Sequence, residues 1–518
     1  MLPLVSAGYQ MYYDQRELQV QFPGLRVGDT IEVAFVHRDV AAHNMFDEYF
    51  GDLVPLQGGN PRARVEYILE APADKPIYFN LPVDKSERDG GKTIVYRHVE
   101  KHVPAIKPEP SMPGWTEFAK YLHASTYRNW DDVGVWYWNL VREQLIVNDD
   151  IKKGVAEALQ GLPANASEAD KVAAIYTHVV RKTRYVGLEF GINAYKPYRT
   201  TEIYARQFGD CKDKASLLKV MLGEVGIDSH LVLVRTRDNG TLPERPASLA
   251  AFNHAITYVP SLDLFLDGTA EWSGATELPS GDQGASVLVV EDGKGASYRK
   301  IPMSEAADNR RRVQQLVELA SDGSATLQHD VTITGAGAAR TRASFQSAEQ
   351  RKERLTAVLS DAYAGVDVSD VKAPGIDDIN VPATLSAKLK VPKFSREDGT
   401  GRQFYVLGRP FSLAPALAGL EKRKHDLDLD VPSSQTFTLS YELPAGHRFA
   451  RMPQNKTIDT DLGSFSLKVE STRDGAKVQS ELVLDHSRTT PAQYPEFRDF
   501  LRRVDESLEQ TFEVVADR

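Results

Sequence analysis

The only cysteine of the chain, Cys211, lies in the polar segment GDCKDK at residues 209–214. Gly209 and Asp210 interrupt the chain, and apolar residues recur at helical spacing from Ala215 onward, so we predict that a helix begins at Cys211. A thiol in the first turn lies among unpaired N–H groups at the positive end of the helix, and nearby lysines also favour the thiolate. The pattern indicates a nucleophile. The alternative is a small buried hydrophobe, for which charged neighbours are a poor environment.

A histidine and an aspartate lie at the ends of a predicted hairpin. His254 opens the predicted strand HAITYV, and the predicted strand LDLFLD closes at Asp267. A turn centred on Pro260 and Ser261 places His254 directly opposite Asp267, with about 4.5–5.5 Å between their Cβ atoms. A turn displaced by one residue makes them diagonal neighbours. A carboxylate beside the imidazole fixes its tautomer and leaves the other ring nitrogen for a thiol. The alternative is a structural histidine beside a surface acid.

Cys211, His254 and Asp267 in this chain order are typical of nucleophilic acyl transfer, in which a thiolate attacks an amide carbonyl. Two other segments resemble known binding loops, but each lacks a residue that the loop requires. The loop at 335–340 resembles a dinucleotide loop, but an arginine stands where close packing needs a small residue. The acids at 426, 428 and 430 lack the glycine of a calcium loop.

Composition excludes several other classes of site and partner. The 12 histidines show no metal-binding spacing, and one cysteine excludes a disulfide and a cysteine-rich zinc site, so we expect no metal and no cofactor. The net charge of −10 repels phosphate backbones, so we expect no nucleic-acid partner. No apolar stretch approaches the ~18 residues of a transmembrane helix.

Length and periodicity predict a multidomain α+β protein, because 518 residues exceed what one core supports. Residues 1–110 alternate with period two in RELQVQF and TIEVAFVH, which predicts an antiparallel, β-sandwich-like domain. Residues 111–300 predict a central α+β domain. Residues 301–518, after a polar linker at 300–312, predict a mainly-β domain with two helices.

Within the central segment we expect three helices and then strands. Residues 115–145 show aromatic and aliphatic side chains at helical spacing. Ser167 and Asp170 form a capping-box pattern for a second helix. The third helix begins at Cys211 and ends near Val225, before Gly226.

The segments YVGLEFG, FGDCKDKASLLKVML, FNHAI and LFLDGTA resemble bacterial transglutaminase-like proteins. In that family a papain-like cysteine domain follows a β-rich domain of unknown function. The resemblance covers most of the chain, and GDCKDKA is its specific motif. By position, Cys211 matches the nucleophile of the family, His254 its base and Asp267 its orienting acid. Gln207 is near, but the side chain that completes an oxyanion hole is not assigned.

The resemblance implies a cysteine acyl-transfer enzyme with a peptide or protein substrate. Hydrolysis would make it a peptidase or amidase, and an amine acceptor would make it a transamidase. The alternative is a non-catalytic interaction protein, whose β-rich arms bind peptide or glycan on a transglutaminase-like scaffold. The substrate, the acyl acceptor and the oligomeric state stay open.

The N-terminal segment bears on location. MLPLVSAGYQMYYDQ lacks the basic region and the apolar run of a signal peptide, although the family resemblance suggests a bacterial periplasmic protein. The first clear strand pair resembles the middle of a β-rich domain. We therefore predict either an exposed, strand-poor N-terminal edge or a start assigned too far downstream.

Alkylation of Cys211 separates the two functions that the sequence leaves open. If Cys211 is an activated nucleophile, its reaction with iodoacetamide will have a pH midpoint well below the ~8.5 of a free thiol. Measuring the alkylation rate against pH tests this. A midpoint at or above that value would favour the scaffold.

Overall fold

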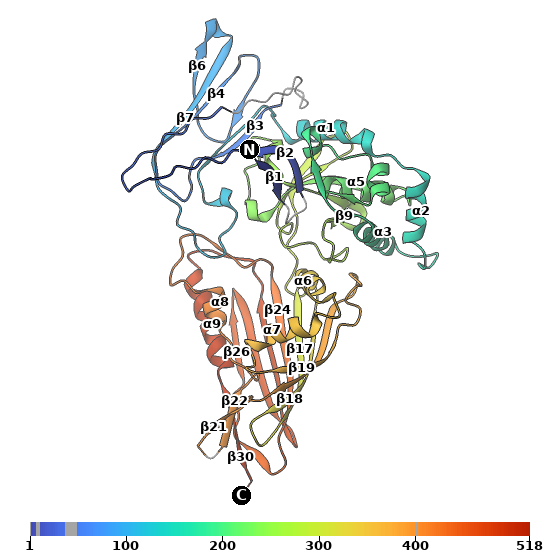
Figure 1. The fold of residues 1–518 in the computed structure, drawn as a ribbon, viewed down its shortest axis with the longest axis vertical. Helices are drawn as coiled ribbons and strands as arrows, with labels where there is room; N and C mark the ends of the chain where they lie inside the picture. Colours follow the sequence, from blue (N-terminus) through green and yellow to red (C-terminus); the bar gives the residue numbers. More distant parts are fainter. Residues whose placement is uncertain (1, 7–10, 37–48, 400, 518) are drawn as a thin grey trace.

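The computed structural model describes residues 2–6, 11–36, 49–399 and 401–517, which form three regions. A β-rich N-terminal region and a mixed α+β middle region lie side by side at one end of the molecule (Figure 1). A mainly-β C-terminal region forms the other end (Figure 1). The predicted multidomain α+β fold is confirmed. Among the described residues, no helix has the length and apolar character that crossing a bilayer requires.

The N-terminal region contains two small antiparallel sheets that share one core. The first sheet has the strand order β4 (Arg62–Pro72), β7 (Thr93–Val103) and β6 (Asp84–Arg88). The second sheet has the strand order β3 (Gly51–Pro55), β8 (Tyr121–Ser125) and β5 (Tyr78–Phe79). Apolar side chains from both sheets pack together, among them Leu56, Ala71, Tyr96 and Leu122. The helix predicted at 115–145 is therefore wrong in its first half, because β8 pairs there with β3.

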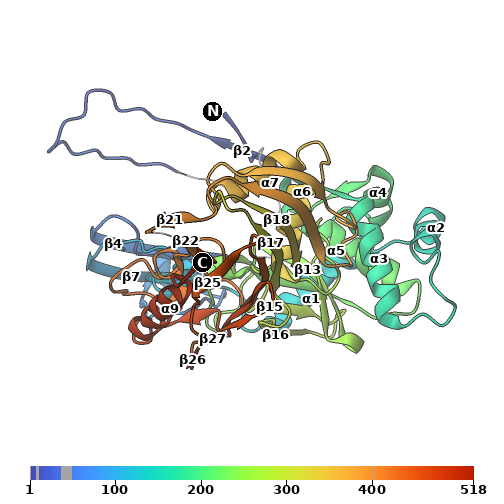
Figure 2. The same ribbon diagram turned by 90° about the horizontal axis from the view of Figure 1, so that it is seen from below.

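The strands predicted at 16–22 and 30–37 are also wrong. The first strands are β1 (Leu2–Ser6) and β2 (Met11–Glu17), and β2 pairs in parallel with β10 (Gly187–Glu189) of the middle region. Residues 18–36 form no strand and project from the molecule (Figure 2). Their alternating pattern suits a strand, but no other described residue pairs with their backbone, and apolar side chains such as Val27 and Phe35 are exposed. His37 lies outside the described residues.

The middle region is built on an antiparallel five-stranded sheet. In order across the sheet, the strands are β14 (Leu264–Leu266), β13 (His254–Val259), β12 (His230–Arg235), β15 (Ser286–Val290) and β16 (Ala296–Lys300). The helices are α1 (Trp130–Val141), α2 (Asp149–Ala158), α3 (Glu168–Lys182), α4 (Thr200–Arg206) and α5 (Cys211–Gly223). A short parallel pair joins β9 (Arg184–Tyr185) to β11 (Phe208–Gly209). The capping box predicted at Ser167 is confirmed at the start of α3.

Helix α5 lies at the centre of the middle region. Leu217, Leu218 and Met221 pack with α3 in one apolar cluster, while Ala215 packs with α1 in another. The Thr257 hydroxyl of β13 donates a hydrogen bond of 3.1 Å to the carbonyl oxygen of Ala215. Because α5 is packed on several sides, the position of its first residue is fixed relative to the sheet.

In its described residues, the C-terminal region contains a large sheet, a smaller sheet and four helices. The large sheet has the order β19 (Asp367–Lys372), β20 (Ala383–Val391), β18 (Ala325–Ile333), β17 (Arg310–Leu319), β24 (Ser433–Glu442), β28 (Gly475–Leu484), β27 (Gly463–Ser471) and β26 (Lys456–Thr460). The smaller one has the order β21 (Arg396–Asp398), β22 (Gly401–Tyr405), β30 (Thr511–Ala516) and β25 (His447–Arg451). The remaining strands β23 (Leu427–Asp428) and β29 (Arg488–Thr489) form a short pair.

Two expectations for the C-terminal region are wrong. The described residues form the helices α6 (Ala336–Phe345), α7 (Arg351–Ser360), α8 (Leu413–Leu417) and α9 (Tyr494–Leu508), which are four instead of the two predicted. The predicted linker at 300–312 is shorter, because β16 ends at Lys300 and the three arginines begin β17. Cross-strand pairing along β17 supplies the order that the local sequence did not indicate.

A buried arginine joins the C-terminal region to the middle region. Arg342 of α6 has no exposed surface, and its guanidinium forms two hydrogen bonds with the Glu277 carboxylate, at 2.6 and 3.1 Å. It also donates to the carbonyl oxygens of Trp272 and Val381. Trp272 and Glu277 belong to the loop that follows β14, so α6 fixes this loop.

Replacing Arg342 tests this contact. We expect Arg342→Met to lower the free energy of unfolding by about 3–5 kcal/mol, because Glu277 loses its cation in a mostly buried place. Urea unfolding followed by circular dichroism measures the change. The exposed Arg340 on the same helix offers the control, since Arg340→Met should change the free energy by less than about 0.5 kcal/mol. Equal effects of both substitutions would contradict the proposed anchoring.

Candidate active site

The start of α5 places Cys211 at a helix N-terminus, as the sequence predicts. Asp210 is the N-cap, and its side chain accepts a hydrogen bond of 3.3 Å from the backbone N–H of Asp213. Gly209 is required here, because a Cβ atom would lie only 2.6 Å from the Cβ of Asp213. Cys211 is half-buried, and its backbone N–H points out of the first turn without an intrahelical acceptor.

The charged residues around Cys211 are buried. Lys212 forms an ion pair with Asp210, and Lys214 donates a hydrogen bond to the carbonyl oxygen of Thr183. Asp213 accepts hydrogen bonds from Arg206 at 2.7 Å and from a backbone N–H at 2.9 Å. Each charge therefore has a partner, and these contacts fix the first turn of α5 from several directions.

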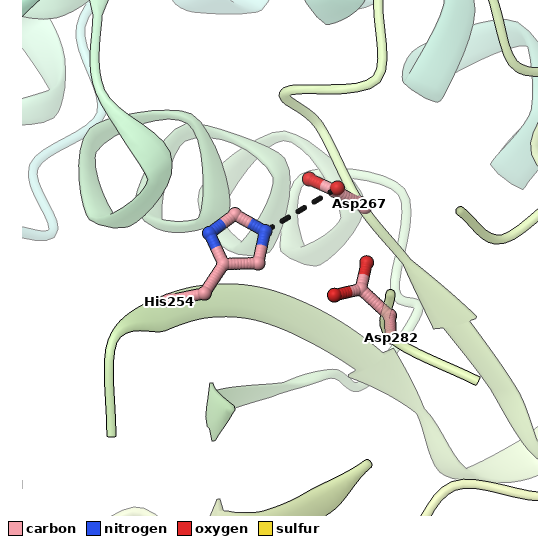
Figure 3. Close-up of side chains that lie close together, drawn as sticks. All are labelled: His254, Asp267 and Asp282. Atoms are coloured by element: carbon pink, nitrogen blue, oxygen red, sulfur yellow. Dashed lines mark ion pairs between the residues drawn. The ribbon is translucent and has the colours of Figure 1, made fainter. Parts of the chain in front are cut away.

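His254 and Asp267 lie close together beside Cys211. The Nε2 atom of His254 is 3.3 Å from Oδ2 of Asp267, and their side chains are 15% and 5% exposed. The other ring nitrogen points away from Asp267 (Figure 3). Cys211 lines the same cavity as His254 and is near enough to raise the pKa of the imidazole. The backbone N–H and the hydroxyl of Thr269 both donate to Oδ1 of Asp267, at 2.8 and 2.7 Å.

The predicted direct pairing of His254 with Asp267 is wrong by one residue at the turn. In the observed register Val259 faces Leu264 and Thr257 faces Leu266. Extending this register makes Asp267 a diagonal neighbour of His254, as expected for a turn displaced by one residue. The cause is the 3₁₀ turn Pro260–Leu262, which ends at a left-handed Asp263 and moves the turn centre.

The electrostatics of this pair favour two opposite charges. Burial alone would lower the pKa of His254, but the Asp267 carboxylate and the nearby Cys211 raise it well above its usual value. Burial alone would raise the pKa of Asp267, and the His254 imidazolium lowers it instead. The charged imidazolium is thus stabilised next to the sulfur, as a thiolate–imidazolium pair requires.

A cavity of about 250 Å³ opens beside Cys211 and His254. Most of its lining is apolar or aromatic, with Tyr137, Tyr195, Leu233, Leu249, Phe252 and Ala255. Glu189 and Lys212 supply charge at its wall. A peptide or acyl group could therefore lie against an apolar surface with its carbonyl carbon near the sulfur.

Gln207 does not line this cavity. It is exposed at the left-handed end of α4. Tyr137 and Tyr185 lie close enough to Cys211 for its charge to contribute to their pKa values, which burial raises first and the Cys211 charge raises further. Both hydroxyls therefore remain protonated and available as hydrogen-bond donors near the sulfur, a role that the sequence pattern did not indicate.

Asp282 is the other residue of the site that the sequence pattern missed. His254, Asp267 and Asp282 each offer a ligand atom within 4.8 Å of the others, the arrangement of a possible cation site. The imidazole nitrogen that faces the acids already contacts Asp267, so a cation could use it only if the imidazolium lost its proton and this contact opened. The donor set therefore suits a proton-sharing triad better than a resident metal.

Three segments of the chain match known protein families. Residues 154–268 match the transglutaminase-like superfamily, and this range contains Cys211, His254 and Asp267. Residues 3–107 and 406–514 match two domains of unknown function with solved structures, DUF3857 and DUF3858. No curated protein matches the chain.

Two solved structures are similar to the chain. A candidate protease of Parabacteroides distasonis ATCC 8503 has a TM-score of 0.59 and 15% identity, over 90% of this chain and 75% of that one. A candidate cysteine protease of Cytophaga hutchinsonii has a TM-score of 0.20 and 13% identity, over 49% of this chain and 88% of that one. The first similarity shows a shared fold. The chain therefore carries a transglutaminase-like domain between two domains of unknown function.

Proposed function

We propose that the protein is a cysteine acyl-transfer enzyme that cleaves peptide or protein amides. The observation that carries the proposal is the buried ion pair of His254 with Asp267, which lies beside Cys211 in the wall of one cavity. A structural histidine would need only one such partner. Here the imidazole links an acid to the single thiol of the chain, at the mouth of an apolar cavity.

In the proposed reaction the Cys211 thiolate attacks the amide carbonyl carbon. The C–N bond then breaks, the His254 imidazolium gives its proton to the departing amine, and a thioester remains on the sulfur. The backbone N–H of Cys211 is placed to donate to the oxyanion. Asp267 holds the ring and supports its positive charge without accepting the proton itself.

A second nucleophile then resolves the thioester. With water, His254 accepts a proton, the C–S bond breaks and a carboxylic acid leaves, which is peptidase or amidase activity. With a primary amine the same steps give a new amide. Hydrolysis is the reaction that we favour, because the solved relative with the shared fold is described as a candidate protease.

The first prediction from the proposed reaction concerns the nucleophile. Cys211→Ala should abolish hydrolysis of a fluorogenic peptide library while leaving the folded structure nearly intact, because the side chain is small and half-buried. Cleavage rates with and without added cadaverine separate hydrolysis from transamidation, and circular dichroism checks folding. Wild-type turnover by Cys211→Ala would refute the nucleophile. A wild-type protein that shows neither reaction, with a slow and ordinary thiol, would favour the interaction protein.

The second prediction concerns Asp267. Asp267→Asn should reduce the cleavage rate by up to about 10⁴-fold, because the amide no longer stabilises the imidazolium or fixes its tautomer. Asp263→Asn is the matched control at the other end of the same hairpin, where Asp263 accepts only a hydrogen bond from Tyr258. Comparable losses in both variants would indicate a general distortion of the hairpin and contradict the orienting role.

A further inference from the structure

Asp282 lies against the proposed triad and has no role in the steps given so far. It is 3% exposed, and its carboxyl group points toward Asp267 and His254 (Figure 3). Each of the three side chains has a ligand atom within 4.8 Å of the other two. Two carboxyl groups therefore share one nearly water-free place with a single imidazolium.

The hydrogen bonding of Asp282 is incomplete in a specific way. Its Oδ2 atom is buried, and no donor from the described residues reaches it. A buried carboxylate without donors is costly, and a second carboxylate beside it increases the cost. A protonated carboxyl group removes both problems, because it carries no charge and supplies the missing hydrogen atom for a bond to its neighbour.

We propose that Asp282 is a positioning residue that remains a neutral carboxylic acid and donates a hydrogen bond to Asp267. The bond holds the Asp267 carboxylate against His254, so the chain of contacts runs from Asp282 through Asp267 and His254 to Cys211. The catalytic meaning of this arrangement rests on the proposed function, but the carboxyl pair itself does not.

The surrounding charges support a bound proton. Burial, and after it the charges of Asp267 and Asp238, raise the pKa of Asp282 to about 8 against the opposing effect of the His254 imidazolium. Tyr176 also faces this place, and its pKa is raised well above the usual value, first by burial, so its hydroxyl stays neutral. This hydroxyl donates to the backbone oxygen of Asp267, so it does not compete with Asp282 for the carboxylate.

The loop around Asp282 is built to hold it still. Its N–H donates to the carbonyl oxygen of Pro279, and its own carbonyl oxygen accepts from the N–H of Ala285. The Gln283 amide donates to the carbonyl oxygen of Leu278 at 2.7 Å. Asp282 therefore approaches Asp267 from a loop that is itself hydrogen-bonded, which is the requirement for orienting another side chain.

The test compares Asp282→Asn, which keeps a hydrogen-bond donor but is not ionisable, with Asp282→Ala, which has neither a donor nor an ionisable group. In the wild type the folded state binds a proton that the unfolded state releases above about pH 4, so stability falls as the pH rises toward about 8. Asp282→Asn lacks this dependence. Its unfolding midpoint minus that of the wild type should therefore increase between about pH 5 and about pH 9.

Alkylation of Cys211 by iodoacetamide at neutral pH is the second measurement. Asp282→Ala should slow it by about tenfold or more, and Asp282→Asn should recover most of that loss. If the difference in unfolding midpoint between Asp282→Asn and the wild type did not change with pH, the proposal would be overturned. So would equal slowing by both substitutions, or a midpoint raised by Zn²⁺ or Ca²⁺ in the wild type alone, which would indicate a cation site.

The two readouts also separate this inference from the proposed function. If no peptide is cleaved but the unfolding midpoints follow the expected pH dependence, the acyl-transfer proposal fails and the carboxyl pair stands. If Cys211-dependent cleavage is found but the unfolding midpoints do not follow the expected pH dependence, the acyl-transfer proposal stands and the proposed role of Asp282 fails.

Discussion

The contact between His254 and Asp267 is the constraint on which the site depends. Two opposite charges are held almost out of water, and such a pair is stable only when its geometry is tight and its remaining polar atoms have partners. The hydrogen bonds of Thr269 and the docking of β13 on α5 satisfy this requirement from different directions. The charged, buried first turn of α5 then brings the sulfur to the same point.

Local signals in the sequence are sufficient to predict where the helix and the strand that carry Cys211 and His254 begin. Asp210 caps α5 as its side-chain chemistry predicts, and His254 begins β13 as predicted. The turn between β13 and β14 was misplaced by one residue, since the left-handed Asp263 gives no clear pattern. Asp282 could not be found, because an irregular loop brings it back to the site and no periodicity encodes such a path.

The errors in the larger architecture have a different cause. Residues 121–125 become a strand because β3, far away in the sequence, pairs with them. Residues 18–36 have strand-like alternation, yet no described residue pairs with them. Whether a segment forms a strand thus depends on a partner strand for its backbone hydrogen bonds. A helix such as α3 forms these hydrogen bonds within itself, and its capping box can be recognised in the sequence.

The Arg342 contact has a consequence for how the three regions can evolve. Asp267 and Asp282 stand at the two ends of a loop whose middle is fastened by a residue of the C-terminal region. Insertions, losses or exchanges of that region would therefore disturb the spacing of two acids in the neighbouring site. The transglutaminase-like domain of this chain is consequently not an exchangeable module, and its geometry is a joint property of two domains.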